Sequence, residues 1–463
     1  MRSKKNGSGK RFKYGLLSVL CLVVLAGAVW LLIVKFEGKP PVINLEMADN
    51  YIAADAQIPV SVKDPDSGIR KVWIALMQDG EETVLKEQTW QSGAALAKGG
   101  KRSFSLEVKP GDLGFSDGAA LLRVAVWDHS WRGWLSGNRA YTEKKLVIDT
   151  VPPRVEVLTR QHNIRQGGSG LLIYRLSETC KKHGVSVDGQ FFPGYSGYFD
   201  DPDVYLSFFG IGHDQPADAD MHVRAVDRAG NSARTGFHYY LGKGRFDAER
   251  LNISESFLRK ILPGFRGAAG MPEDADPVKQ FLFINQELRR KNNQTILSAA
   301  GKTDTRMHWS GAFTRLPNSA RKAAFADRRT YIHKGEVIDK QVHLGIDLAS
   351  TRQAQVPAAN AGRVAFDGQA GIYGNVVTID HGFGLFSVYA HLSRSLVEEG
   401  QVVDQSEVIG YTGSTGLAGG DHLHFGMFIQ DVFVNPVEWW DGSWIQNNVS
   451  AKLEHVRDSL DGQ

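Results

Sequence analysis

The chain has 463 residues, of which 42% are hydrophobic, 23% charged and 10% aromatic. These fractions are typical of globular proteins and exclude both wholesale disorder and a polytopic membrane protein, and the length predicts about three domains. The formal net charge of +3 arises at the amino terminus, where the first thirteen residues include six basic and no acidic ones. The rest of the chain contains the other 48 of the 54 basic residues and all 51 acidic ones, so it is slightly acidic overall. We therefore expect no nucleic-acid partner.

Residues 14–34 form an uncharged run that is rich in Leu, Val and Ala. A helix of this length spans about 30 Å, the thickness of a bilayer core. A cleaved signal peptide is the alternative, but its apolar core is typically ~7–15 residues long and a small-residue cleavage site follows it. Here Lys35 and Phe36 follow instead. We therefore predict a single-span anchor over residues 1–36, with a cytoplasmic basic tail and the rest of the chain outside.

Short alternating segments such as 58–62 and 72–76, separated by turn signals such as 64–68, predict β-strands after the anchor. The opening at 39–45 recurs at 150–157, and the strand predicted at 122–128 resembles 221–227. A repeat about 110 residues long predicts two immunoglobulin-like β-sandwich modules, at residues 37–150 and 151–243. We interpret both as spacers. Glycan binding by exposed aromatic residues such as Trp127, Trp131 and Trp134 is the alternative.

Residues 244–300 change to a helical pattern, and we expect a short helical connector. Asp276 is typical of an N-cap, and Pro277 of the first turn of a helix. Apolar residues follow at spacings of three and four, at Val278, Phe281, Ile284 and Leu288. The basic run 289–291 is interpreted as the solvated end of this helix, favoured there by the helix dipole.

Five of the 14 histidines lie within residues 343–424, namely His343, His381, His391, His422 and His424. Neutral imidazole is the commonest metal ligand in proteins. A strand through residues 421–425 directs His422 and His424 to the same face. Asp347 follows His343 by four residues, which adds a carboxylate of metal-ligand type. Each spacing alone is weak evidence, since a solvated strand face or a salt-bridged Asp explains it equally well.

Residues 343–426 carry these histidines within a longer ordered series of motifs. The series runs His343 to Asp347, Val356-Pro357-Ala358-Ala359, Gly362-Arg363-Val364, Tyr373-Gly374-Asn375, His381-Gly382, Tyr389-Ala390-His391-Leu392, a glycine-rich turn from Gly410 to Gly420, and His422-Leu423-His424-Phe425. This series of motifs closely resembles the catalytic core of the LytM/lysostaphin-type zinc metallopeptidases. The resemblance covers about 100 to 140 residues and says nothing about residues 1–240.

The resemblance implies one zinc ion, held by His343, Asp347 and His424, and a catalytic pair made of His391 and His422. His381 occupies a position that is not a ligand, and we interpret it as structural. The implied fold is an antiparallel-β lysostaphin-like domain with a duplicated hybrid motif, at residues 301–445, followed by a tail at 446–463. The whole chain is thus expected to be a mainly β multidomain protein.

The implied activity is zinc-dependent endopeptidase cleavage of the peptide stems or cross-links of peptidoglycan. The anchor then places the enzyme in the inner membrane with its catalytic domain in the periplasm, where proteins of the cell-wall machinery are further possible partners. A non-catalytic envelope scaffold that regulates cell-wall amidases is the alternative, although all the implied ligands are present. The glycine-rich turn has two interpretations that we weigh equally. It is either a surface along which an extended peptide lies or a plain hairpin loop. The connector and residues 309–331 could cover the groove.

Overall fold

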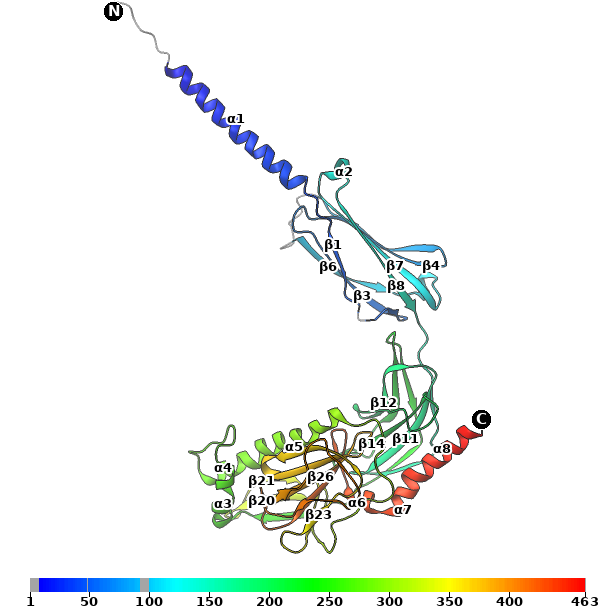
Figure 1. The fold of residues 1–463 in the computed structure, drawn as a ribbon, viewed down its shortest axis with the longest axis vertical. Coiled ribbons are helices and arrows are strands. Elements are labelled where there is room, and N and C mark those ends of the chain that lie inside the picture. The colour runs from blue at the N-terminus through cyan, green and yellow to red at the C-terminus, as the bar shows by residue number, and fades with distance from the viewer. Residues whose placement is uncertain (1–7, 48, 92–99, 463) are drawn as a thin grey trace, which may run out of the picture. The chain divides into compact units, whose positions relative to one another are not determined.

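The computed structural model describes residues 8–47, 49–91 and 100–462, and most of its regular structure is β (Figure 1). The first seven residues of the predicted basic tail lie outside the described part. The chain divides into two compact units: the first comprises Met1–Pro152 with Asp227–Asn231, and the second comprises Pro153–Val226 with Ser232–Gln463.

Helix α1 (Ser8–Lys35) contains the predicted membrane segment. Its window Lys13–Trp30 has a mean hydropathy of 1.9, is 18 residues long and is not buried against the protein. Since a bilayer core requires about 20 apolar residues, α1 is long and apolar enough to span it. Such a helix is typical of a membrane anchor or of a signal sequence.

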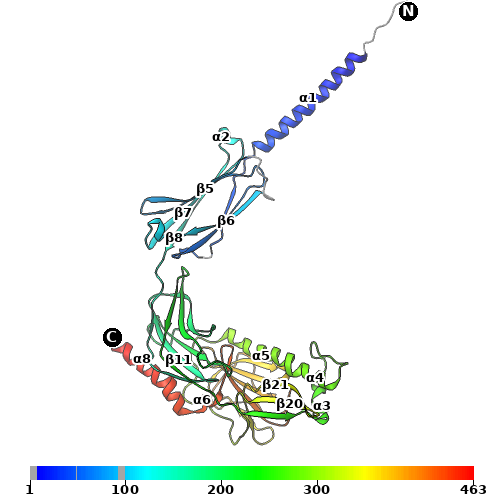
Figure 2. The ribbon, with the colours of Figure 1, turned by 180° about the vertical axis from the view of Figure 1, so that it is seen from behind.

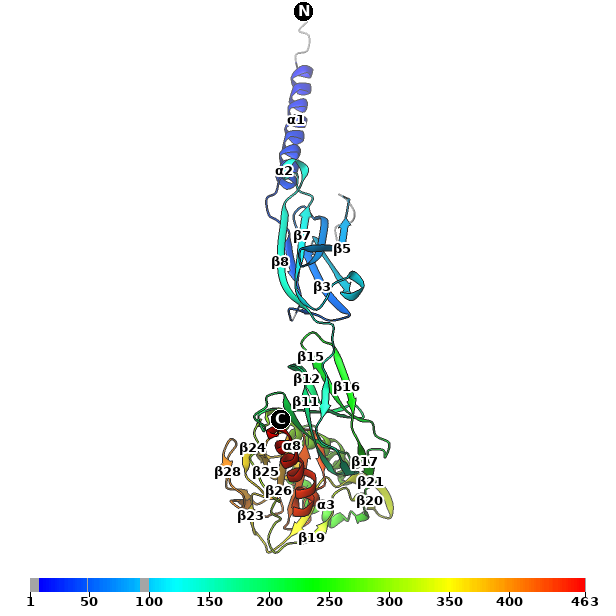
Figure 3. The same cartoon turned by 90° about the vertical axis from the view of Figure 1, so that its right-hand side faces the viewer.

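The rest of the first unit is a sandwich of two sheets, which Figure 3 shows with β7 and β8 on one side and β3 on the other. One sheet has the order β1 (Val42–Leu45), β3 (Ala56–Lys63), β6 (Lys101–Val108). The other has the order β2 (Tyr51–Ile52), β8 (Arg139–Ile148), β7 (Gly118–Asp128), β4 (Ile69–Gln78), β5 (Glu81–Thr89). The short helices η2 (Gly111–Leu113) and α2 (Arg132–Leu135) lie in its connections. The strands predicted at 58–62, 72–76 and 122–128 are confirmed.

Alternation explains this sandwich, because strands such as β7 bury every second residue between the two sheets. Val60, Ile74 and Val124 are at most 1% exposed within the resulting core. We call this part the first sandwich. The immunoglobulin-like assignment of both modules and their boundaries stay predictions.

The second module forms three small sheets. Their orders are β14 (Val204–Gly210), β11 (Ser169–Leu176), β9 (Val155–Val157); β13 (Gln190–Pro193), β12 (Cys180–Val187), β15 (Met221–Asp227), β16 (Ser232–Gly236); and β10 (His162–Arg165), β17 (Tyr239–Gly242). Its core is continuous with that of the C-terminal part. The ring of Phe208, for example, lies 6.1 Å from Trp309 and 6.0 Å from Trp439. Residues 153–226 are therefore an integral part of the second unit.

The connector contains β18 (Ala248–Asn252), α3 (Glu255–Ile261), η3 (Leu262–Phe265) and a longer helix that begins where the sequence predicts. Asp276 caps helix α4 (Pro277–Phe283), since its carboxylate accepts hydrogen bonds from the Val278 and Lys279 N–H groups at 2.7 and 3.1 Å. The predicted end at residues 289–291 is wrong. The helix continues through the π-helical turn η4 (Ile284–Leu288), α5 (Arg289–Leu297) and the 3₁₀ turn η5 (Ser298–Lys302). Burial of Asn292 and Ile296 against the protein explains the continuation.

The C-terminal part is built on an eight-stranded antiparallel sheet. The order is β19 (Ala320–Ala323), β22 (Ile346–Ala349), β30 (Leu423–Ile429), β26 (Leu385–Leu392), β25 (Asn375–Asp380), β24 (Gly362–Gln369), β28 (Val402–Val403), and β31 (Val432–Val434) pairs with β30. A second sheet has the order β23 (Gln355–Pro357), β29 (Val408–Tyr411), β27 (Arg394–Ser395), and the 3₁₀ turn η6 (Gly371–Tyr373) precedes β25. The central strands β26 and β30 are buried along their whole length, which explains their nearly continuous apolar sequence.

A third sheet joins the connector to this part of the chain. Strand β18 pairs in parallel with β20 (Arg328–His333), which pairs with β21 (Glu336–Val342). Helix α5 lies beside β20 and β21 in Figures 1 and 2.

The predicted tail at 446–463 is helical in its described residues. Helices α6 (Pro436–Trp440) and α7 (Gly442–Ile445) lead into η7 (Gln446–Ser450) and α8 (Ala451–Asp461). Helix α8 lies near β11 (Figure 2). It buries Leu453 and Val456, and the Lys452 ammonium donates a hydrogen bond to the Leu171 carbonyl of β11 at 3.0 Å.

Candidate active site

Three side chains converge on one point at the end of the central sheet. Asp347 on β22 lies directly opposite His424 on β30 in the antiparallel register, and His343 precedes β22 in the turn after β21. The His343 Nε2 atom lies 2.9 Å from Asp347 Oδ1 and 3.0 Å from His424 Nδ1, and His424 Nδ1 lies 3.0 Å from Asp347 Oδ1. The three predicted metal ligands are thus brought together.

This donor set fits a zinc ion. Tetrahedral ligands with zinc bonds of 2.0–2.1 Å lie about 3.3 Å apart, close to the separations found here. Hydrogen bonds alone explain the arrangement poorly, because two imidazole nitrogens that both donate to one carboxylate oxygen gain nothing from facing each other at 3.0 Å. His343 and His424 are only 3% and 4% exposed, as expected of ligands that a fold holds in place.

Groups behind the three predicted metal ligands orient their side chains. The His343 Nδ1–H group donates to the Ala324 carbonyl at 2.9 Å, which leaves the lone pair of Nε2 directed at the site. Arg329 on β20 donates from Nη2 to Asp347 Oδ2 at 3.1 Å, so the second carboxylate oxygen is also held. The Arg329 Nε atom lies 3.4 Å from a carboxylate oxygen of Glu249, on the neighbouring strand β18.

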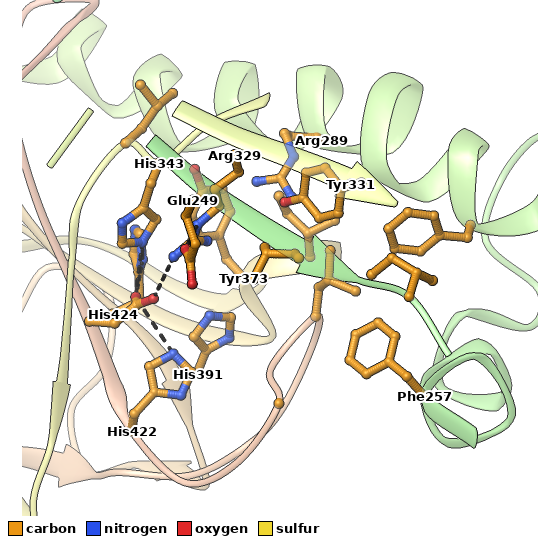
Figure 4. A pocket seen from close by; sticks show the side chains of 18 of the residues that line it. Glu249, Phe257, Arg289, Arg329, Tyr331, His343, Tyr373, His391, His422 and His424 are labelled. Carbon is orange, nitrogen blue, oxygen red and sulfur yellow. Dashed lines mark hydrogen bonds and ion pairs between the residues drawn. The ribbon is translucent and has the colours of Figure 1, made fainter. Parts of the chain in front are cut away.

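The predicted catalytic pair lies against the same cluster (Figure 4). The rings of His391 and His422 lie 4.8 Å apart, and the ring of His391 lies 5.8 Å from that of His424. The His391 Nδ1–H donates to the Thr415 carbonyl and the His422 Nδ1–H to the Gly420 carbonyl, both at 2.8 Å. These bonds leave Nε2 of each ring for chemistry. The His422 Nε2 atom lies 3.6 Å from Asp347 Oδ1.

The electrostatics of the cluster favour an ionised Asp347. Burial alone raises the pKa of Asp347, but the charge of His343 and the hydrogen bonds from the histidines hold that pKa well below its ordinary value. Burial, together with the neighbouring His422 and His424, lowers the pKa of His391 to about 3. Burial also lowers the pKa of His424 to about 4. Burial lowers the pKa of His422 as well, but the hydrogen bond and charge of Asp347 raise it above its ordinary value overall.

A cavity of about 260 Å³ opens onto the cluster. The predicted site residues form one side of it. The other walls come from the connector and the strands before the first ligand, through Glu249, Leu251, Asn252, Ile253, Phe257, Phe281, Arg289, Arg329 and Tyr331 (Figure 4). The segments expected to cover the groove therefore contribute directly to its walls.

The remaining histidines of the C-terminal part lie away from the cavity. The His381 Nδ1–H donates to the Ala361 carbonyl at 2.8 Å, and its Nε2 accepts from the Ser387 hydroxyl at 2.7 Å. Both ring nitrogens are thus bonded within the fold, in agreement with a structural role. His308 pairs with Asp304 at 2.9 Å, and His333 bonds to the Ile253 carbonyl at 2.7 Å. Neither His308 nor His333 lines the cavity.

Different glycines of the glycine-rich turn have different environments. Gly416 has a φ of 70°, and a Cβ atom there would lie 2.4 Å from the Gly374 nitrogen and the Ile372 oxygen, so close packing requires glycine. Gly419 lines the cavity and, like Gly420, has open space where a Cβ atom would lie. The turn is thus both a packed loop and an open wall.

The sequence pattern does not identify Arg329, Glu249 or Arg289 as site residues. Arg329 lies in the mostly polar strand Arg328–His333, so its pattern resembles that of an exposed strand. Arg289 donates to the Asn285 carbonyl and side chain at 3.1 and 2.6 Å while it lines the cavity, and is not the solvated helix end that was predicted.

Comparison with known proteins identifies the same segment. The model of peptidase family M23 matches residues 341–436. DD-carboxypeptidase/endopeptidase Mpg of Neisseria meningitidis serogroup B is 44% identical over 97 residues, which are 21% of this chain and 22% of that protein. Peptidoglycan DD-endopeptidase ShyC of Vibrio cholerae is 32% identical over 127 residues, which are 27% of this chain and 29% of that protein. The chain thus spans about a fifth to a third of the length of these curated relatives.

Among solved structures, the catalytic domain of the antimicrobial peptidase lysostaphin from Staphylococcus simulans is 25% identical. It covers 28% of this chain and 98% of its own chain, with a TM-score of 0.25. All five predicted site residues lie within the segment matched by the family model. Residues 341–436 are therefore a peptidase family M23 domain, and the converging histidines and aspartate lie inside it.

Proposed function

We propose that this protein is a zinc-dependent endopeptidase that hydrolyses the peptide stems or cross-links of peptidoglycan. The observation that carries the proposal is the convergence of His343 Nε2, Asp347 Oδ1 and His424 Nδ1 within 3.0 Å of one another, inside the M23 domain. Two further imidazoles with oriented ring nitrogens lie beside them.

Zinc at such a site lowers the pKa of a bound water toward about 7 and polarises a carbonyl group. The chain itself supplies the means of moving protons. The His391 and His422 rings each keep Nε2 free because Nδ1–H is bonded to a backbone carbonyl. One can accept a proton from the attacking water, and the other can donate a hydrogen bond to the developing oxyanion.

The substrate class is supported by the relatives and by the shape of the site. Mpg and ShyC are named for DD-peptidase activity, and ShyC for peptidoglycan. The cavity has an open wall at Gly419 and apolar sides at Leu251, Phe257 and Phe281, which suits an extended peptide better than a compact folded substrate.

The location proposed for the enzyme is the inner membrane, with α1 as a single-span anchor, the amino terminus in the cytoplasm and the M23 domain in the periplasm. The basic residues before α1 and the apolar window Lys13–Trp30 support this orientation. In that compartment the partners are the membrane, peptidoglycan peptides and proteins of the cell-wall machinery.

A non-catalytic scaffold is the less favoured function. A scaffold has no need to keep metal donors and proton carriers together, yet the three ligands and both catalytic candidates are present and close to one another.

The proposal is tested with the full chain in detergent, incubated with purified peptidoglycan, the released muropeptides being analysed by mass spectrometry. We expect about one zinc ion per chain and cleavage at a peptide bond. The His343→Ala variant should lose both zinc and cleavage, whereas His391→Ala should keep zinc and lose cleavage.

His455→Ala is the matched control, because this histidine is exposed on α8 and remote in sequence from the donors. A folded wild-type chain that binds no zinc, or that binds zinc and leaves peptidoglycan intact, would contradict the proposal.

A further inference from the structure

A second group of carboxylates lies far from the M23 domain in sequence, at the end of the first sandwich. Glu37 lies in the segment between α1 and β1, Asp64 directly follows β3, and Asp128 is the last residue of β7. One oxygen from each carboxylate lies within 4.8 Å of the others. Asp64 and Asp128 are 2% and 0% exposed, and Glu37 is half-buried. The group thus joins both sheets of the first sandwich to the segment that leaves α1.

The donors that surround this group are neutral. Asn138 donates from Nδ2 to Asp128 Oδ2 at 2.8 Å and to Glu37 Oε1 at 2.9 Å. Ser67 also donates to Glu37 Oε1, at 3.1 Å. Among the described residues, no lysine or arginine forms an ion pair with any of the three carboxylates; the nearby Lys39 pairs with Asp66 instead, at 3.4 Å. Three carboxylates are therefore gathered without a protein cation to balance them.

Asp64 gives an independent indication of a missing partner. Its Oδ1 atom accepts hydrogen bonds from the Asp66 and Ser67 N–H groups at 2.9 and 3.1 Å. Its Oδ2 atom is buried and has no hydrogen-bond partner among the described residues. A buried carboxylate oxygen without a donor is costly, and native folds usually supply either a donor or a metal ion.

The electrostatics agree with this geometry. Burial raises the pKa of Asp64; hydrogen bonds from the Asp66, Ser67 and Gly68 N–H groups oppose the rise, and the charge of Asp128 adds to it. Burial likewise raises the pKa of Glu37; hydrogen bonds from the Lys39 N–H and the Ser67 hydroxyl oppose the rise, and the charges of Asp128 and Asp64 add to it. A cation at the centre would remove this mutual repulsion.

We propose that Glu37, Asp64 and Asp128 form a binding site for one calcium ion, which fastens the segment after helix α1 to the first sandwich. Calcium accepts 6–8 oxygen ligands at 2.3–2.6 Å, so any two oxygens of one site lie at most about 5 Å apart. The three carboxylates satisfy this limit, since one oxygen of each lies within 4.8 Å of the others. Three carboxylates from three separate segments suit calcium better than magnesium, which usually takes one or two carboxylates and keeps several waters.

The segment is already positioned for such a fastening. The Lys35 carbonyl accepts a hydrogen bond from the Trp131 N–H at 2.6 Å, and the Glu37 carbonyl accepts from the Ser130 hydroxyl at 2.9 Å. Calcium bound to the Glu37 side chain would add a strong link to these weak ones and stiffen the joint between α1 and the first sandwich.

The test measures calcium binding to the full chain in detergent. Divalent ions are removed with a chelating resin, zinc is restored to saturation and magnesium is kept constant. Radioactive calcium is then titrated in by equilibrium dialysis. We expect one saturable calcium ion per chain, with a Kd of about 1 mM or tighter, as in extracellular calcium modules. Asp64→Asn should weaken binding at least about tenfold, since it replaces Oδ2 while it keeps the Oδ1 acceptor for the two N–H groups.

Asp66→Asn is the matched control, because Asp66 lies two residues away and pairs with Lys39 outside the group. It should bind calcium like the wild type. The absence of saturable calcium binding in the wild type, or equal binding by Asp64→Asn, would overturn the proposal.

Thermal unfolding separates a calcium ligand from a merely structural acid. Calcium should raise the Tm of the wild type and leave that of Asp64→Asn unchanged. Without calcium, Asp64→Asn should be at least as stable as the wild type, because it relieves the repulsion. Equal destabilisation by Asp64→Asn with and without calcium would refute the site, and Glu37→Gln provides a second variant for the same comparison.

Discussion

The buried carboxyl group of Glu438 should make the second unit less stable as the pH rises toward 7. Glu438 on α6 accepts a hydrogen bond at Oε2 from the Ser169 N–H of β11 at 2.8 Å, and its other oxygen lies against Gly168. It thus joins the M23 part of the chain to the second module. Burial raises the pKa of Glu438 to about 7, although the Ser169 hydrogen bonds and the charge of Arg165 oppose the rise.

The sign and size of the effect follow from this pKa. A carboxyl group with a pKa of 4.5 unfolded and about 7 folded binds its proton more tightly in the folded state. Its contribution is complete below pH 4.5, is lost as the pH rises to 7, and changes no further above that. A difference of about 2.5 pKa units corresponds to about 3 kcal/mol, and partial solvent access reduces our expectation to about 2 kcal/mol.

The assay compares the wild type with Glu438→Gln by calorimetry at pH 5 and pH 8. Glutamine keeps an acceptor for the Ser169 N–H and removes the charge. The Tm of the wild-type transition should fall between these pH values by several degrees more than that of the variant, since about 1 kcal/mol shifts the Tm of a domain of this size by about 2–4 °C. Glu454→Gln, at an exposed position on α8, is the control. An equal pH dependence in wild type and Glu438→Gln would refute the reasoning.

The remaining predictions concern the candidate active site. Arg329→Met should weaken zinc binding about 10–100-fold, because it frees Asp347 Oδ2; dialysis against a competing chelator measures this, and an unchanged zinc affinity would contradict it. Gly416→Ala should lower the unfolding free energy by about 1–3 kcal/mol and reduce peptide cleavage, because its Cβ clashes with the backbone beside the Thr415 carbonyl that orients His391; urea denaturation and muropeptide release measure the two effects. Removal of zinc should lower the Tm of the second unit and leave the first-sandwich transition unchanged, since bound ligand stabilises only the unit that holds it; equal shifts in both transitions would argue against a site confined to the second unit.

The sequence predicts those features that depend on local physics. Alternation locates the strands of the first sandwich because one face of each strand packs against the opposite sheet. The cap at Asp276 is predicted because its hydrogen bonds lie within three residues. The end of the same helix is predicted wrongly, since burial of Asn292 and Ile296 depends on contacts with residues ~80 positions away, such as the bond from Ile372 N–H to Asn292 Oδ1.

The candidate site also contains residues that local sequence identifies and residues that depend on distant contacts. The five predicted residues lie together because an ordered series of short motifs identifies them, although the catalytic roles of His391 and His422 stay predictions. Arg329 and Glu249 are not identified, because an arginine and a glutamate on mostly polar strands are ordinary surface residues until the pairing of β18 with β20 is known. Pairing of strands separated by ~80 residues has no local sequence signal.

That pairing also determines how much of the chain the site needs. Strand β18 supplies Glu249 and Leu251 to the cavity and pairs with β20, the strand that carries Arg329. A fragment that began at residue 300 would lack β18 and would expose an edge of β20. It would also lack Phe281, whose ring lies 5.7 Å from that of Tyr331. Arg329 would lose its Glu249 neighbour, and the constraint on Asp347 Oδ2 would weaken with it. We therefore expect the smallest fragment that preserves the site to begin before Ala248, well upstream of the segment that the family model matches.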